Sequence, residues 1–216
     1  MTQIKITKYE QICVTVELED AFFVFDPGSE ASMDLIRTHR SATAAFVSHA
    51  HPDHFNSGNL RLLGCPVYGT KEVVDALDGD IDVKLLEHNS PVSIKQLSVN
   101  PFSVNHGPIS APIDNLGFHI TALGVSILFL GDIKVASPIP KANYDVIFVP
   151  VGGSKVFDLE EAFAFIQDSA LDGVVIPSHY HGRADRESGD LFVRRAGAAF
   201  ETRELAVGES LTFDGK

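Results

Sequence analysis

The hydrophobic pattern in the first part of the chain predicts short strands, followed by two helices. Segments rich in Ile, Val and Phe are broken by polar turns and predict strands at 2–8, 11–18, 21–25 and 43–48. The segments 57–63 and 70–77 have the spacing of helices, and a short strand is expected between them at 66–68. The last of the four strands, TAAFVS at 43–48, is a continuous apolar run, which is typical of a strand buried on both faces.

The middle of the chain returns to strand patterns. These strands are expected at 82–87, at 91–104 in two pieces, at 115–122 and at 124–130. Gly124 stands where one strand would turn into the next. This part is therefore expected to be β-rich.

The last third of the chain alternates strands and helices. Strands are predicted at 146–150 and 173–177, helices at 159–169 and 187–198, and two short terminal strands within 203–213. Asp158 followed by Glu161 resembles a capping box, which would start the first of these helices. A β-rich half followed by a mixed half predicts an α+β fold in which two sheets pack face to face with helices outside. We expect one domain over residues 1–216, because no repeat or linker-like stretch interrupts the sequence.

Composition narrows the classes of function. The formal net charge of −12 argues against nucleic acid as a partner, because phosphate backbones are bound by Lys and Arg surfaces. No apolar run is long enough to span a bilayer, and MTQIKITKYE lacks the apolar core of a signal peptide. Cys13 and Cys65 do not form a CxxC pair. These features predict a cytoplasmic protein, and a homo-oligomer is compatible with them.

The stretch FVSHAHPDHF, residues 46–55, concentrates metal-binding side chains directly after a predicted strand. His49 and His51 are two residues apart, so on an extended strand end they point the same way and can hold one ion together. Pro52 fixes a turn and redirects Asp53 and His54 towards a neighbouring position. Imidazole and carboxylate donors suit Zn²⁺, Fe or Mn²⁺. The pattern therefore predicts part of a two-metal centre.

This cluster cannot complete two metal coordination spheres, so other segments must contribute. Three further places stand at the ends of predicted strands: FSVNHGP with His106, ILFLGDI with Asp132, and VVIPSHYHG with His179 and His181. Each is weak by itself, because a lone histidine after a strand is usually a surface or hydrogen-bonded residue. Their order and spacing together make a chance occurrence improbable.

With these motifs in place, the chain resembles the metallo-β-lactamase superfamily, whose ordered motifs are HxHxDH, a later His, a later Asp and a final His. The resemblance covers nearly the whole chain. The segments GD at 131–132, VPVGG at 149–153, DLEEA at 158–162 and IPSHY at 176–180 are most similar to the UlaG-like branch of metal-dependent hydrolases. The resemblance implies a four-layer αββα sandwich with the site at one edge of the sheets.

The resemblance also implies a ligand set. It assigns one metal to His49, His51 and His106, the other to Asp53, His54 and His179, and a bridging role to Asp132. On an extended segment His179 and His181 could both face the metals. The context IPSHY favours His179 as the ligand, and His181 is then a candidate for substrate contact or proton transfer, or is a solvent-exposed histidine.

Such a centre would activate water without a serine or cysteine nucleophile, because two metal ions lower the pKa of a bridging water molecule and stabilise the oxyanion. Asp53 or Asp132 could accept the proton of that water molecule. Asp26, at the end of FVFDP, is expected either to hydrogen-bond a ligand histidine or to serve only as a turn residue. Gly152-Gly153-Ser154 is expected to form a plain turn rather than an anion site, and basic side chains near the predicted site loops are candidates for a substrate anion: Lys134, Lys155, Arg183 and Arg186.

The leading hypothesis is a dinuclear hydrolase, with two divalent ions, Zn²⁺ or otherwise Mn²⁺ or Fe, and a metal-bridging hydroxide that cleaves a lactone or ester. A phosphorylated sugar lactone is one such small-molecule substrate, and bound metals would make an anionic substrate compatible with the acidic chain. The alternatives are a phosphodiesterase acting on a cyclic nucleotide, a phospholipid or RNA, and an iron-dependent oxidoreductase of the same fold. A family member that only binds partners would commonly lack metal ligands, and none is missing.

Overall fold

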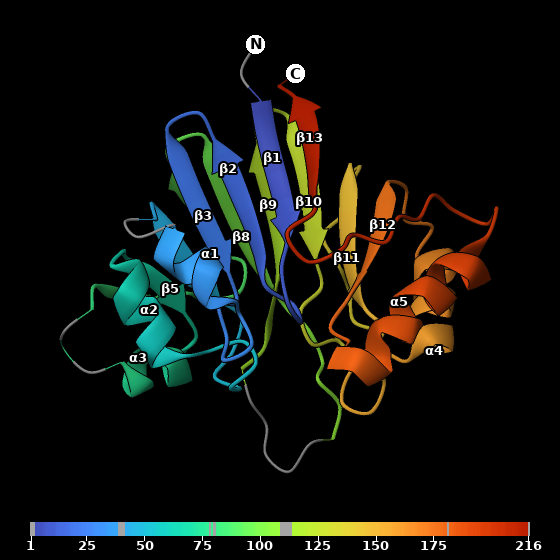
Figure 1. The fold of residues 1–216 in the computed structure, drawn as a ribbon, viewed down its shortest axis with the longest axis horizontal. Helices are drawn as coiled ribbons and strands as arrows, with labels where there is room; N and C mark the ends of the chain where they lie inside the picture. The colour runs from blue at the N-terminus through green and yellow to red at the C-terminus, as the bar shows by residue number, and fades with distance from the viewer. Residues whose placement is uncertain are drawn as a thin grey trace.

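The computed structural model describes residues 3–38, 42–77, 79, 81–108, 114–180 and 182–215, without the side chains of residues 33 and 182–188. Two sheets lie face to face in it (Figure 1). The first sheet has seven strands, in the order β13 (Ser210–Asp214), β1 (Gln3–Lys8), β2 (Val14–Leu18), β3 (Ala21–Phe25), β4 (Ala44–Val47), β5 (Val67–Gly69) and β6 (Val83–Leu85). The second has six, in the order β12 (Val174–Ser178), β11 (Val146–Pro150), β10 (Val125–Phe129), β9 (Leu116–Ala122), β8 (Leu97–Ser103) and β7 (Val92–Ile94).

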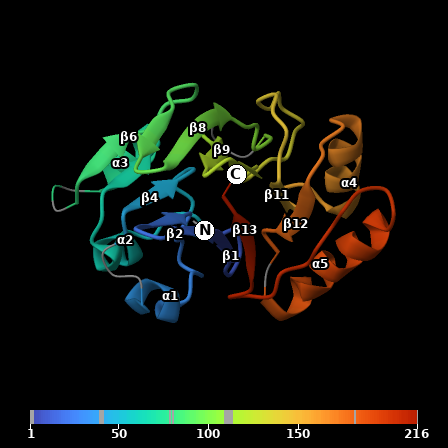
Figure 2. The same ribbon diagram turned by 90° about the horizontal axis from the view of Figure 1, so that it is seen from above.

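Helices cover the outer face of each sheet, as Figures 1 and 2 show from two directions. On the side of the first sheet lie α1 (Met33–Thr38), α2 (Ser57–Leu63) and α3 (Lys71–Ala76). On the side of the second sheet lie α4 (Leu159–Asp168) and α5 (Gly182–Ala196), which contact each other. The expected αββα sandwich is thereby confirmed. No helix in these ranges is both long and apolar enough to cross a membrane.

Three hydrophobic clusters fill the spaces between the four layers. The central cluster takes Phe23 and Phe25 of β3, together with Ile127 and Phe129 of β10, from the two facing sheets. Alternate residues of the same strands enter the outer clusters, as Val24 does beneath the helices on its side. This double burial explains why the strand segments are continuous apolar runs instead of alternating ones.

Strand pairing brings the ends of several strands to one edge. The pairs β3–β4 and β4–β5 are parallel in the first sheet, and β10–β11 and β11–β12 are parallel in the second. The carboxyl ends of β3, β4, β10 and β12 therefore lead into loops at the same edge, which is where open α/β sheets bind ligands.

Three predictions about elements were wrong. α1 was missed: Leu35 and Ile36 are buried against the first sheet, and the Ser32 Oγ accepts a hydrogen bond from the Leu35 amide, but six residues are too few to show a helical period. α5 begins at Gly182 instead of 187, because its polar first half carries no hydrophobic pattern. It ends at Ala196, before Gly197 at φ 53°.

At the carboxyl end, one strand, β13, replaces the two expected within 203–213. The preceding stretch instead forms a turn in which Glu209 accepts hydrogen bonds from the Ala206 amide and the Arg203 guanidinium. The capping box of α4 is confirmed, because Asp158 and Glu161 each accept a hydrogen bond from the other's backbone amide.

Candidate metal centre

The donors proposed from the sequence all stand in loops that follow strands at the shared edge. His49 to His54 follow β4, His106 follows β8, Asp132 follows β10 and His179 directly follows β12. These residues come from both sheets, so the site lies at the mouth between them. The structure brings all seven together, in two groups of four that share Asp132.

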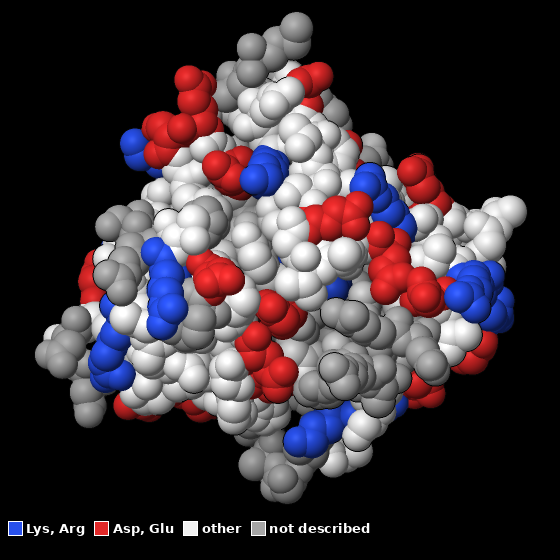
Figure 3. Space-filling model, viewed as in Figure 1, with Lys and Arg blue, Asp and Glu red and all other residues white. Residues whose placement is uncertain are grey.

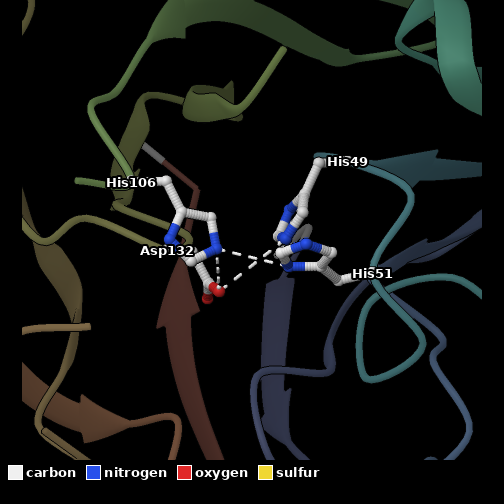
Figure 4. A group of neighbouring side chains, drawn as sticks. All are labelled: His49, His51, His106 and Asp132. Atoms are coloured by element: carbon white, nitrogen blue, oxygen red, sulfur yellow. Dashed lines mark hydrogen bonds and ion pairs between the residues drawn. The ribbon is translucent and has the colours of Figure 1, made fainter. Parts of the chain in front are cut away.

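The first group consists of His49, His51, His106 and Asp132 (Figure 4). Each offers one donor atom, and these atoms lie within 4.8 Å of one another. The His106 Nε2 lies 3.0 Å from Asp132 Oδ2 and 3.3 Å from His51 Nδ1, and the His49 Nε2 lies 3.7 Å from the same carboxylate oxygen. Two imidazoles thus approach one oxygen of Asp132, and the third, that of His51, lies against His106.

The second group consists of Asp53, His54, Asp132 and His179. His54 Nε2 and His179 Nε2 lie 2.9 and 3.0 Å from Asp132 Oδ1, and His179 Nε2 lies 3.1 Å from Asp53 Oδ2. The two oxygens of Asp132 therefore face different groups, Oδ2 the first and Oδ1 the second. This is the arrangement that a bridging carboxylate requires.

Asp26 and Ser48 orient one histidine of each group. Asp26 is fully buried and accepts hydrogen bonds from the Ser48 amide (2.7 Å), from Ser48 Oγ (2.7 Å) and from His54 Nδ1 (2.8 Å). Ser48 gives its only hydroxyl proton to Asp26, so its 3.0 Å contact with His49 Nδ1 is donated by the imidazole. Both histidines are protonated on Nδ1 and present Nε2 to the cluster. The expectation that Asp26 bonds a ligand histidine is confirmed, whereas Ser48 was missed although it directly precedes His49.

Close backbone approaches hold two of the ligand loops in place. A Cβ added at Gly28 would lie 1.9 Å from the Asp53 carbonyl oxygen, and one at Gly152 would lie 2.2 Å from that of His179. Both distances are shorter than any non-bonded contact, so only glycine fits. The FDPG turn therefore packs directly against the backbone at Asp53, and the VPVGG segment packs directly against the backbone at His179.

The histidines of the two groups differ in the direction of their pKa shifts. Burial, followed by the charge of His54, holds the pKa of His49 well below its ordinary value, and burial lowers that of His51. Burial also opposes protonation of His54 and His179, but neighbouring carboxylates outweigh it for both. Asp132 and Asp26 raise the pKa of His54 well above its ordinary value, and Asp132 and Asp53 raise that of His179 to about 9.

The two carboxylates are held in the ionised form. Burial alone would raise the pKa of Asp53 and of Asp132, but the neighbouring His54 and His179 reverse the effect and lower both. The negative charge of Asp132 is therefore buried, with 2% of the residue exposed. Buried charge is tolerated only where a cation or hydrogen-bond donors compensate it.

The donor set fits metal ions. The neutral His49 imidazole turns the lone pair of Nε2 towards Asp132 Oδ2, and this buried nitrogen has no hydrogen-bond partner among the residues that the structure describes. Two acceptors that face each other in a buried site call for a cation between them. Imidazole and carboxylate donors in groups of four are what Zn²⁺, Mn²⁺ and Fe take. The clustered residues could thus hold a two-metal site.

The other side chains proposed from the sequence are described only in part. His181 is outside the described residues, as are the side chains of Arg183 and Arg186. Lys134 forms an ion pair with Glu161 at 2.6 Å, which ties the loop after β10 to the start of α4. The Gly153 amide donates to the Phe157 carbonyl within a turn, as expected for a plain turn.

Comparisons with known proteins agree with this fold. A family model described as the β-lactamase superfamily domain matches residues 5–179. No curated protein matches the chain in sequence.

Several solved structures share the fold. The chain is similar to Igni18, a metallo hydrolase from the archaeon Ignicoccus hospitalis, with a TM-score of 0.82 and 20% identity over 99% of this chain and 100% of that one. It is similar to the metallo-β-lactamase fold protein YhfI from Bacillus subtilis, with a TM-score of 0.76 and 15% identity over 99% and 100% of the two chains. It is also similar to CmlA, a diiron β-hydroxylase from Streptomyces venezuelae, with a TM-score of 0.75 and 14% identity over 98% of this chain and 54% of CmlA.

Proposed function

The chain belongs to the β-lactamase superfamily and has the metallo-β-lactamase fold, and on that premise we propose that it is a dinuclear metal-dependent hydrolase that opens a lactone or cleaves an ester. The observation that carries the proposal is the pair of four-donor groups that share Asp132. We place the chain in the UlaG-like branch on the segments GD, VPVGG and IPSHY. A sugar lactone, with or without a phosphate, is the substrate class that this branch suggests.

Two divalent ions held by these groups would lower the pKa of a water molecule and stabilise negative charge on the substrate oxygen. One ion would be held by His49, His51 and His106, the other by Asp53, His54 and His179, and both by Asp132. In this proposal His51 and Asp53 face the substrate, because they are partly exposed while the other donors are buried. The substrate therefore reacts at the more exposed side of each group.

Asp53 is the better candidate for the proton acceptor. Its side chain is 25% exposed and ionised, whereas both oxygens of the buried Asp132 are turned towards the two groups. Water adds to the substrate carbonyl carbon and loses a proton to Asp53, the carbon–oxygen bond of the ester breaks, and the leaving oxygen takes up that proton. The proposed role of His181 in substrate contact or proton transfer is tested by His181→Ala, which should lower kcat and leave the metal content at two ions.

The distribution of charge on the surface agrees with a small-molecule substrate. On the face seen in Figure 3, acidic and basic side chains are interspersed, and the described residues there form no continuous basic surface. Binding to RNA, which a phosphodiesterase acting on RNA needs, usually rests on such a surface.

A second candidate function is iron-dependent oxidation. The similarity in fold to the diiron β-hydroxylase CmlA favours it, since His and carboxylate donors also suit iron. This candidate requires that the purified protein contain iron and consume oxygen with a substrate.

The test combines elemental analysis with a substrate panel. The panel contains δ-valerolactone, glucono-1,5-lactone, p-nitrophenyl acetate and bis(p-nitrophenyl) phosphate, and the control is His51→Ala. We expect two metal equivalents per chain and hydrolysis of a lactone or ester that His51→Ala abolishes. Full activity with one equivalent overturns the dinuclear mechanism, hydrolysis of only the phosphodiester identifies a phosphodiesterase, and iron with oxygen uptake identifies the oxidoreductase.

A further inference from the structure

Two buried asparagines bind the backbone of segments that carry or support the proposed metal ligands. Asn115 directly precedes β9 and Asn59 lies in α2, and they are 3% and 7% exposed. In each, the side-chain amide faces two backbone carbonyl oxygens: those of Asp132 and Val104 for Asn115, and those of Gly28 and Pro27 for Asn59. Carbonyl oxygens only accept hydrogen bonds, so the atom that faces them is the amide nitrogen, and the orientation of both side chains is fixed.

Asn115 connects the loop of Asp132 with the loop of His106. Its Nδ2 donates to the carbonyl of Asp132 at 2.8 Å and makes a longer contact, of 3.5 Å, with the carbonyl of Val104, two residues before His106. The Val104 amide donates back to the carbonyl of Asn115 at 3.1 Å. Asn115 therefore fixes the backbone of the carboxylate that the two donor groups share.

Asn59 holds the FDPG turn, which lies against the second group. Its Nδ2 donates to the carbonyl of Gly28 at 2.7 Å. This turn contacts two ligands of the second group, because Gly28 packs directly against the backbone at Asp53, and Asp26 accepts a hydrogen bond from His54. A change at Asn59 would therefore act through the turn on both of these ligands.

The two asparagines differ in which ion they can affect. The shared carboxylate faces both groups, whereas the FDPG turn reaches the first group only through Ser48, which connects Asp26 with His49. We propose that Asn115 and Asn59 are positioning residues of the metal centre, Asn115 for both ions and Asn59 mainly for the ion of the second group. These roles rest on the two-metal centre proposed above, but not on the reaction that it performs.

An amide suits these positions because it supplies two N–H donors and no charge. A cationic donor at position 115 would compete with a metal ion for the field of the buried Asp132. An aspartate there would turn a carboxylate towards carbonyl oxygens, which repel it. Asparagine thus holds the backbone without changing the charge of the centre.

The test removes the amide donors one residue at a time. Asn115→Leu and Asn59→Leu keep the approximate size of the side chain. Zn²⁺ is titrated by calorimetry into the metal-free full chain, and the ligand variants His51→Ala and Asp53→Asn identify which binding step belongs to which group. We expect Asn115→Leu to weaken both ions by about tenfold or more. Asn59→Leu should weaken the ion of the second group by that factor and the other ion by less.

A general loss of stability has to be separated from a change at the centre. Ile166→Val removes a methylene from a buried position of α4, so it should lower the melting temperature and leave both affinities unchanged. The absorption spectrum of bound Co²⁺ depends on the arrangement of the ligands, and it should change in Asn115→Leu but not in Ile166→Val. If a Leu variant does not fold, the Ala variant replaces it, because the smaller side chain leaves room for water at the two carbonyls. The same order of effects is then expected.

The possible results decide between the proposals. Unchanged affinities in Asn115→Leu overturn the positioning roles, and so does an Asn59→Leu variant that spares the ion of the second group or weakens both ions equally. Fewer than two ions in the wild type overturn the metal centre together with these roles. The expected affinities in a protein that hydrolyses no lactone or ester uphold the positioning roles and reject the hydrolase.

Discussion

The two donor groups share Asp132 but differ in charge. The first combines three imidazoles with that carboxylate, and the second combines two imidazoles with two carboxylates. The additional carboxylate, Asp53, is one reason why the pKa of His179 is raised while the pKa values of His49 and His51 are lowered. His49 and His51 of the first group therefore offer neutral nitrogens at pH 7, whereas His179 of the second group must give up a proton to bind a metal ion.

The two groups are also anchored differently. His54 of the second group donates directly to the buried Asp26, while His49 of the first reaches Asp26 only through the Ser48 hydroxyl. Ser48 lies between them, 3.0 Å from one imidazole and 3.2 Å from the other. A single hydroxyl thus connects sites that differ in charge, and this connection can be tested separately from the ligands.

Asp132→Ala removes the residue that both groups share, and should have the largest effect. We expect both metal equivalents to be lost and the proposed hydrolysis to fall by about 10³-fold or more, the several kcal/mol that bound metal ions typically supply. Metal content by elemental analysis and lactone or ester hydrolysis measure it. Asp75→Ala, which changes an exposed aspartate paired with Lys71, is the control and should retain both. Retention of two ions by Asp132→Ala would contradict the shared site.

His51→Ala and Asp53→Asn separate the two groups. Each changes a partly exposed ligand that belongs to one group, so folding should be little affected. We expect each variant to retain the other ion and to bind its own ion more weakly by at least about 10–100-fold. That is the loss typically caused by changing a residue that only hydrogen-bonds a metal ligand, and changing the ligand itself should cost no less. Metal titration by calorimetry resolves the two ions. Equal loss of both ions in either variant would show that the groups do not bind independently.

Ser48→Ala tests the hydroxyl that connects the groups. Because Ser48 contacts a histidine of each, we expect affinity for both ions to fall by about 10–100-fold, with each chain still able to bind two ions at high metal concentration. Ser126→Ala is a matched control, since the Ser126 hydroxyl also bonds a histidine, His119, at 2.9 Å but outside the site. If Ser48→Ala weakens only one ion, the connection through this hydroxyl is absent.

The charge difference predicts unequal pH dependence. A raised pKa means that His179 holds its proton up to about pH 9, so the second ion must displace it, and its affinity should rise with pH by about tenfold per unit for each proton released. The first ion meets the imidazoles of His49 and His51, whose pKa values are lowered, so its affinity should change less with pH above pH 7. Calorimetry in buffers of different ionisation enthalpy counts the protons released. If binding of each ion releases the same number of protons, the proposed charge difference between the two groups is wrong.

Much of the fold was predictable because the strands are buried on both faces. Val24 of β3 and Leu128 of β10 face the helices while their neighbours face the central layer, and this produces apolar runs that are visible without a structure. α1 and the first half of α5 were not predictable, since one has only six residues and the other begins with a polar stretch. The turn before β13 depends on contacts of Glu209, which no local pattern shows.

Part of the candidate site was likewise predictable from the sequence, and part was not. The spacing of HxHxDH and the positions of His106, Asp132 and His179 after strands led to seven candidate donors, which the structure brings together. Ser48 was missed, because a serine after a strand is common and its role depends on Asp26, a partner distant in the sequence.

The sequence by itself determined which side chains can bind metal and which strands present them, because hydrophobic periodicity and ligand spacing act over a few neighbouring residues. Only the tertiary structure decided that Asp132 turns one oxygen to each group and that Ser48 contacts a histidine of both. These features depend on the pairing and packing of two sheets. Distances between segments far apart in the chain are set by that packing, and no local pattern encodes them.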